Sequence, residues 1–235
     1  IAGCQKPWDS AIYTRQKETF QKRTADRVLK ALRICHPVER IRQNLYRWME
    51  TAKYENKTQK LGRVGGIRSN IRTASDRAHS NLERLRCLVP TRVCASVLHT
   101  LFNGWTTGSR FQKKGGRCVF GCCASAGDKL EHYCRCPIVL KVTEHKHRIQ
   151  VAPTAGLSFW MLDFSTSDDD LLRASAMSIY MAYITFNTFK HKETPPGEEV
   201  IVAAMKQCIL QGSFGHAALK KFVTDRWQSP VIPFH

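Results

Sequence analysis

The stretch 118-CVFGCCASAGDKLEHYCRC-136 contains two closely spaced pairs of metal-binding side chains. Three residues separate Cys118 from Cys122 and His132 from Cys136, and nine residues lie between the pairs. Each pair can chelate from one turn while the linker folds back, as a tetrahedral structural zinc site requires. The sequence therefore predicts a closed Zn²⁺ site with these four ligands and no open position for catalysis.

Two neighbouring cysteines leave the ligand set open. Cys123 could replace Cys122, and Cys134 could replace Cys136. The spacing of His132 and Cys136 favours Cys136, because positions i and i+4 share one face of a helix. We expect Asp128 to cap that short helix.

The remaining cysteines favour free thiols over a disulfide framework. They are scattered singly, several within helical patterns, as buried thiols in a reducing compartment would be. These residues are Cys4, Cys35, Cys87, Cys94 and Cys208.

Apolar residues on both sides of the cysteine-rich stretch recur at intervals of three and four, which predicts helices. The expected helices are 14–34, 38–49, 67–88, 93–102, 138–150, 170–190, 198–211 and 215–227, and residues 158–164 are ambiguous between strand and helix. No alternation of period two is sustained, so the predicted class is mainly α. We expect a basic helical region (1–88), a helix with a small CCHC zinc knuckle (89–150) and a neutral C-terminal helical bundle (151–235).

Positive charge is concentrated in the first two-thirds of the chain. The 37 Lys and Arg against 19 Asp and Glu give a net charge of +18. Residues 1–90 carry 20 basic and 8 acidic side chains, residues 91–150 carry 10 and 3, and residues 151–235 carry 7 and 8. This asymmetry predicts a directed binding surface for a polyanion.

Basic side chains on the predicted helices and before Cys118 are candidates for phosphate contact. They are Arg15, Lys22, Arg23, Arg27, Arg40, Arg47, Arg63, Arg68, Arg72, Arg77, Arg110, Lys113, Lys114 and Arg117. Phe111 and Phe120, interleaved with arginines, could stack on unpaired bases or form the small core of the zinc module. We assign Trp105 to the core.

No catalytic residues are predicted. Asp168-Asp169-Asp170 is the acidic cluster that invites a catalytic interpretation, but it is better explained as the N-terminal cap of the following helix. The uncharged stretch 174–189 is shorter than the roughly 20 apolar residues of a bilayer helix and contains polar side chains, so it predicts a buried core helix. We expect neither a membrane nor a small-molecule substrate as a partner.

A family resemblance covers roughly half of the chain. The segments LFNGWTTGSRF (101–111), CVFGC (118–122) and DKLEHYCRCPIV (128–139) resemble the zinc-binding region near the C-terminus of reverse transcriptases from non-LTR retrotransposons. The aromatic segment SIYMAYITFNTFKH (178–191) extends the match more weakly. The resemblance implies the same four zinc ligands and a role in holding nucleic acid, whereas the aromatic-x-Asp-Asp motif of the polymerase is missing.

These observations predict a non-catalytic, zinc-stabilised RNA-binding protein, a structural component of a ribonucleoprotein that includes structured ribosomal RNA and other proteins. The chain begins at Ile1, so we expect that an upstream segment was removed and that the protein is mitochondrial, or otherwise in a reducing compartment. One alternative is the C-terminal fragment of an active retrotransposon reverse transcriptase. A second alternative is a protein-interaction module.

Overall fold

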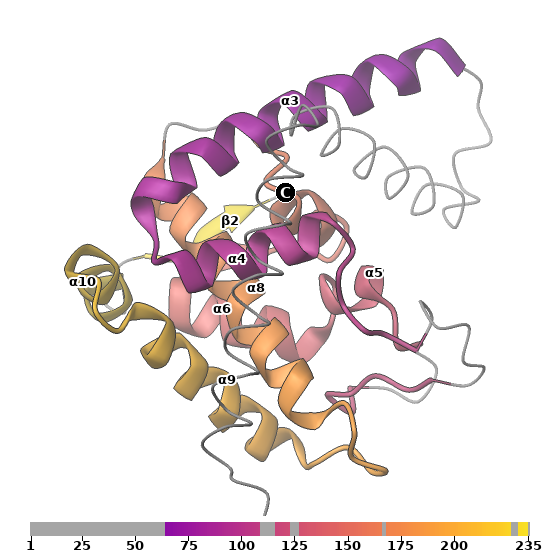
Figure 1. The fold of residues 1–235 in the computed structure, drawn as a ribbon, viewed down its shortest axis with the longest axis vertical. Coiled ribbons are helices and arrows are strands. Elements are labelled where there is room, and N and C mark those ends of the chain that lie inside the picture. The colour runs from indigo at the N-terminus through magenta and orange to yellow at the C-terminus, as the bar shows by residue number, and fades with distance from the viewer. Residues whose placement is uncertain (1–63, 109–115, 123–126, 166–167, 227–229, 235) are drawn as a thin grey trace, which may run out of the picture. The chain divides into compact units, whose positions relative to one another are not determined.

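The computed structural model describes residues 64–108, 116–122, 127–165, 168–226 and 230–234, all within one compact unit, Ile41–His235. The side chains of residues 64–72 and 75 are outside this description. The described residues form eight helices and two short strands (Figure 1), which confirms the mainly α class. The predicted helices 14–34 and 38–49 lie outside the described residues.

A proline separates the first two described helices, α3 (Val64–Leu88) and α4 (Thr91–Leu101). Pro90 cannot continue α3 because it has no N–H, but it suits the position before α4. Both helices turn a helically spaced apolar stripe to the core: Ala74, Ala78, Leu82 and Leu85 in α3, and Val93, Val97 and Leu101 in α4. As predicted, α4 ends before Asn103-Gly104, and Asn103 has a positive φ of 49°.

Helix α8 (Asp169–Phe189) is the centre of the core, and α3, α4, α6, α7 and α9 all pack against it. Asp168 is its N-cap, accepting a 2.8 Å hydrogen bond from the backbone N–H of Asp170, which confirms the predicted capping role. Most side chains of α8 are buried, in agreement with the predicted core helix. Helices α9 (Glu198–Ser213) and α10 (Ala217–Asp225) follow.

Three helices and a strand connect α4 to α8. Helix α5 (Leu130–Tyr133) leads into α6 (Pro137–His147), which begins with a proline and ends where Arg148 adopts a φ of 54°. The short helix α7 (Gly156–Trp160) overlaps the start of the segment 158–164, which the sequence left ambiguous. Strand β1 (Ile149–Val151) pairs in parallel with β2 (Ile232–Phe234), and at three residues each they are too short to produce a recognisable alternation.

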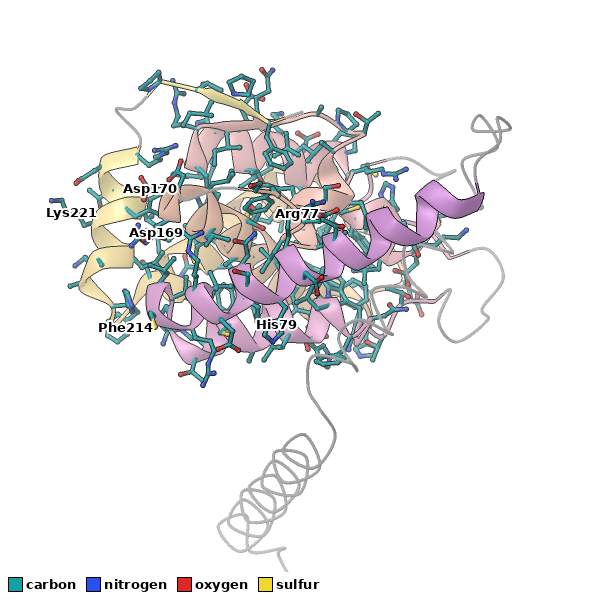
Figure 2. All side chains as sticks on the ribbon, turned by 90° about the horizontal axis from the view of Figure 1, so that it is seen from above. Arg77, His79, Asp169, Asp170, Phe214 and Lys221 are labelled. Atoms are coloured by element: carbon teal, nitrogen blue, oxygen red, sulfur yellow. The ribbon has the colours of Figure 1, made fainter. Side chains whose placement is uncertain are left out.

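Polar side chains attach α3 to the segment before α8. Arg77 donates to Asp163 Oδ1 from Nε (2.9 Å) and Nη2 (2.6 Å). The buried Asn81 donates to the carbonyl oxygens of Leu162 (2.9 Å) and Phe164 (2.8 Å). In Figure 2, Arg77 lies on the side of α3 that faces the rest of the fold. These bonds satisfy backbone carbonyls of an irregular segment and so fix its position.

One hydrophobic core runs through the described residues. It includes Leu85 of α3, Val97 of α4, Val142 of α6, Met181 of α8 and Leu219 of α10, and thus crosses the predicted boundaries at 88/89 and 150/151. Among the described helices, none combines the length and hydropathy needed to cross a membrane.

His147, at the end of α6, is fully buried. Its ring stacks on Phe222 of α10 at 6.0 Å between centroids, and neither ring nitrogen has a hydrogen-bond partner within the described structure. Burial, and then the charge of Arg226, lowers the pKa of His147 to about 3. The folded protein therefore holds this imidazole neutral.

Acid should destabilise the fold through His147. Its pKa is about 3 in the folded protein and 6.5 without burial, so the unfolded chain binds the extra proton as the pH falls through 6.5. The stability present above pH 6.5 is lost toward pH 3, at up to about 1.4 kcal/mol per pH unit. Between pH 7.5 and 5, the free energy of unfolding measured in urea should fall by about 2 kcal/mol less for His147→Leu than for the unmodified protein. Identical pH profiles for the two proteins would contradict this assignment.

Gly156→Ala should destabilise the fold. A Cβ at Gly156 would collide with the carbonyl oxygen of Cys134, a backbone atom that cannot rotate away. We expect a loss of about 2 kcal/mol or more in the free energy of unfolding. Gly197→Ala is the matched control, because a Cβ at Gly197 meets no atom within 4 Å, and it should change stability by less than about 1 kcal/mol. Equal effects of the two substitutions would refute the steric explanation.

Candidate metal centre

A tight turn carries the first ligand pair. Gly121 has a positive φ of 71°, a conformation that glycine adopts without strain, and its N–H donates to the carbonyl oxygen of Cys118 at 2.9 Å. A β-bridge between Arg117 and Gly127 closes the loop that follows. This turn brings Cys122 back toward Cys118.

The second ligand pair spans the junction of two helices. His132 lies in α5, but α5 ends at Tyr133, and Cys136 is the extended N-cap residue of α6. The prediction that His132 and Cys136 share one helical face is therefore wrong. The turn between α5 and α6 brings them together instead, because Pro137 has no N–H and favours the start of a new helix.

Asp128 does not cap α5, so this prediction is also wrong. The N-cap is Lys129, which has no side-chain capping bond. Asp128 instead accepts a 2.5 Å hydrogen bond from the Tyr133 hydroxyl and another, also 2.5 Å, from the backbone N–H of Gly108. Its carboxylate thus connects the segment after α4 to α5.

The predicted ligands Cys118, Cys122, His132 and Cys136 form the Cys/His cluster. Their ligand atoms all lie within 4.8 Å of one another. His132 Nε2 is 3.1 Å from Cys122 Sγ. Cys118 and Cys136 are buried, and every cysteine in the described part of the chain is free.

Close contact between Cys118 and Cys136 changes the protonation of both thiols. A hydrogen bond from Cys136 holds the pKa of Cys118 well below its ordinary value, despite burial, and His132 adds to the effect. The same bond, followed by burial, raises the pKa of Cys136. The cluster therefore favours a thiolate at Cys118, and thiolate is the form of cysteine that binds metals.

The donor set fits a metal ion. Three sulfur atoms and one imidazole nitrogen are a recurrent tetrahedral ligand set, and Zn–S bonds of about 2.3 Å hold neighbouring sulfurs about 3.8 Å apart. The observed limit of 4.8 Å means that only a small contraction is needed. A cation would also replace the proton shared by Cys118 and Cys136, because bound thiols are deprotonated. The Cys/His cluster could thus hold a metal ion.

Cys134 is not part of the Cys/His cluster. Its Sγ donates to the carbonyl oxygen of Glu131 at 3.1 Å, and burial raises its pKa to about 12. A thiol in this environment is a poor metal ligand. Cys123, the other competing cysteine, lies outside the described residues.

Aromatic rings attach the Cys/His cluster to the core. Tyr133 packs against Trp105 at 5.4 Å, Phe120 at 5.1 Å and Phe186 at 5.4 Å between ring centroids. Trp105 is fully buried and donates to Thr100 Oγ1 at 2.8 Å, as its assignment to the core predicts. Phe120 is only 1% exposed, so its ring is a core element and is not accessible for base stacking. Phe111 lies outside the described residues.

Most of the side chains predicted to contact phosphate lie outside the described residues. Arg77 is held by Asp163 at 2.6 Å, and Arg117 is exposed beside the Cys/His cluster. The side chains outside the described residues are those of Arg15, Lys22, Arg23, Arg27, Arg40, Arg47, Arg63, Arg68, Arg72, Arg110, Lys113 and Lys114.

A groove of about 660 Å³ borders Cys118 on the side of Arg117. Lys190, His191 and Lys192, which follow α8 directly, also line this groove, which we call the α8 groove. Sequence reasoning missed these three residues because the net charge of residues 151–235 hides a local basic run. The run KHK directly after a predicted helix was the available signal.

Comparison of the chain with protein-family models, with curated proteins and with solved structures found no match.

The two buried cysteines of residues 134–136 should behave differently on substitution. Cys136→Ser removes a predicted ligand, so it should abolish stoichiometric metal retention and unfold the surrounding segment. Cys134→Ser keeps a donor to Glu131 and should retain one metal ion per chain, with a stability loss of about 1 kcal/mol. Metal analysis after reconstitution with Zn²⁺ and gel filtration measures both. Retention by Cys136→Ser, or loss by Cys134→Ser, would contradict this ligand set.

Proposed function

We propose that this protein is a non-catalytic, zinc-stabilised RNA-binding protein that serves as a structural component of a ribonucleoprotein. The observation that carries the proposal is the α8 groove, in which cationic side chains lie beside Cys118 of the Cys/His cluster. The net charge of +18 is consistent with it, since a polyanion is the natural partner of so basic a chain.

Zinc is the metal that the ligand chemistry favours. Thiolates and imidazole suit Zn²⁺, and four protein ligands leave no position open for substrate. Bound zinc would join residues 118–122 to residues 132–136 as a CCHC knuckle and contribute to local folding. In this proposal its role is structural.

Three cations are arranged around the α8 groove. Lys190 Nζ donates to Thr106 Oγ1 at 2.8 Å and to Asn187 Oδ1 at 2.9 Å, which fixes its position. Lys192 Nζ lies 5.1 Å above the ring of Phe189, and Arg117 is exposed. Side chains held in this way lose little conformational entropy when a phosphate binds.

Two carboxylates also line the α8 groove, but one of them is already engaged. Both oxygens of Asp128 accept short hydrogen bonds, from Gly108 and Tyr133, which fix the carboxylate in place without removing its negative charge. Glu193 is exposed and adjacent to the lysine run. Arg117, Lys190 and Lys192 outnumber these two carboxylates, which favours the phosphates of a polyanion.

RNA is preferred over DNA. A groove beside a small knuckle suits irregular or single-stranded RNA, whose bases are open to contact, better than the regular major groove of duplex DNA. The acidic residues at the start of α8 are used structurally: Asp168 caps the helix, Asp169 pairs with Arg84 at 2.6 Å, and Asp170 pairs with Arg173 at 2.8 Å. This use supports a role without catalysis.

The ribonucleoprotein we favour is a ribosome, with mitochondria as the compartment, and the chain would represent the tail of a retroelement polymerase that kept its zinc module. The alternative of a fragment of an active reverse transcriptase predicts recovery with element transcripts or genomic DNA. The alternative of a protein-interaction module predicts weak RNA affinity that salt does not change. Sequencing RNA that co-purifies with the native complex separates the three.

Binding across a salt series tests the α8 groove directly. Arg117→Gln/Lys190→Gln/Lys192→Gln should weaken binding to a single-stranded RNA at least tenfold, and should reduce the slope of log K against log salt concentration by about 2. Lys141→Gln/Lys220→Gln/Lys221→Gln removes the same charge from other exposed sites and should have a much smaller effect. Equal effects of the two triple variants would show that RNA does not bind specifically at the α8 groove. Absence of salt-dependent binding by the unmodified protein would reject RNA binding itself.

A further inference from the structure

Five exposed side chains form what we call the α9 row: Val200, Ala203, Gln207 and Leu210 lie on the outward face of α9, and Phe214 is the extended residue directly after its end. Val200 is 52% exposed, Leu210 64% and Phe214 79%, and these are three of the five large exposed hydrophobic residues in the described part of the chain. The four helical members are three, four and three residues apart, the spacing of a coiled-coil seam, and Phe214 follows at the end of the helix. Such a seam is suited to packing on another helix.

The opposite face of α9 already packs on the core. Ile201, Met205, Cys208 and Ile209 are buried there, and Gly212 allows Tyr180 and Met177 of α8 to approach closely. The α9 row is therefore additional to the apolar surface that folding uses. Large exposed apolar patches of this kind mark interaction surfaces.

Arg92 of α4 holds the last turn of α9 rigid. Its Nη2 donates to the carbonyl oxygens of Gln211 at 2.9 Å and Gly212 at 3.1 Å, and to that of Phe214. In Figure 2, Phe214 lies at the margin of the described structure. Arg92 thus fixes the backbone that carries Phe214, and the exposed ring is of the kind that serves as an interface anchor.

We propose that α9 pairs with α9 of a second copy of this chain in an antiparallel, two-fold symmetric dimer. A two-fold axis at Gln207 brings the end of α9 that carries Leu210 and Phe214 alongside the start of α9 in the second copy, where Val200 and Ala203 lie. The two Gln207 amides then meet at the axis and can hydrogen-bond to each other. A single polar position in an apolar seam specifies register in coiled coils, and a two-fold interface needs such a self-complementary surface.

Charge at the ends of the α9 row matches the same arrangement. The exposed Glu199 stands at the start of α9, beside Glu198, which pairs with Lys141 at 2.8 Å, while Lys220 and Lys221 lie in α10, after the end of α9. Antiparallel pairing brings each acidic end alongside the basic end of the second copy. A parallel arrangement would place like charges together, which is unfavourable.

The size of the α9 row predicts a weak dimer. At 1.5 Å per residue the 16 residues of α9 span about 24 Å. A single helix pair of this length buries on the order of 1,000 Å² in total, near the lower limit of specific interfaces. Because each copy carries a charge of +18, moderate salt should strengthen the association by screening repulsion. This salt response is opposite to that expected for RNA binding.

Sedimentation equilibrium of the full, zinc-loaded chain over a range of micromolar concentrations tests the dimer. Leu210→Ser/Phe214→Ser should raise the dissociation constant at least about tenfold. Gln207→Leu should lower it by about tenfold, because it replaces the polar position of the seam, and a misfolded variant would not give this gain. Val231→Ser, at an exposed apolar residue outside α9, is the control and should leave association unchanged. Unaltered zinc content and helicity verify that each variant is folded.

Cross-linking then tests the symmetry. The introduced thiols of two Gln207→Cys chains should join each other, giving a peptide that mass spectrometry identifies as a 207–207 pair. A monomer at all concentrations, or a dimer that the Leu210/Phe214 double variant leaves intact, would overturn the proposal. Cross-links from position 207 to distant residues alone would equally exclude the antiparallel arrangement.

Discussion

The hydroxyl group of Tyr133 connects the two ligand-bearing segments to each other and to the core. It donates to Asp128 Oδ1 at 2.5 Å and accepts a hydrogen bond from the backbone N–H of Val119 at 3.2 Å, while its ring packs against Trp105 and Phe186. Val119 follows Cys118, and Tyr133 follows His132, so this one side chain fixes the separation of ligands from both pairs. Burial and the Asp128 carboxylate raise the pKa of the Tyr133 phenol, which keeps it a donor.

In this arrangement, both the packing of the core and a bound metal would hold the Cys/His cluster together. The aromatic core positions the segments to within a small contraction of tetrahedral geometry, and a metal would supply the remaining attraction between thiolates that otherwise share a proton. Preorganisation of this kind reduces the entropy lost on metal binding. It also explains why the wall of the α8 groove that contains Cys118 and Arg117 has a defined shape next to the end of α8.

Local chemistry made much of the fold predictable, and long-range packing set the limit. Asp168 and Pro90 act through adjacent backbone atoms, so the helix boundaries they set followed from the sequence. The spacing of Cys118, Cys122, His132 and Cys136 likewise predicted that these side chains lie close together. The predicted geometry of His132 and Cys136 was wrong, because the i, i+4 rule assumes one continuous helix and Pro137 starts a new one. Asp128 was assigned to a local cap, since its partner Gly108 lies 20 residues away and no local pattern reveals that contact. Lys190 and Lys192 were hidden by averaging charge over a whole region.

The parallel pairing of Ile149 with Ile232 has a consequence for the order of folding. Helices α7 to α10 all lie between the two strands in sequence, so β1 must wait for its partner until this intervening chain has been made and has folded back. Contacts of such high sequence separation form late. Until then the backbone of β1 offers an unpaired strand edge, and nascent or truncated chains that lack residues 232–234 would be prone to aggregate through it.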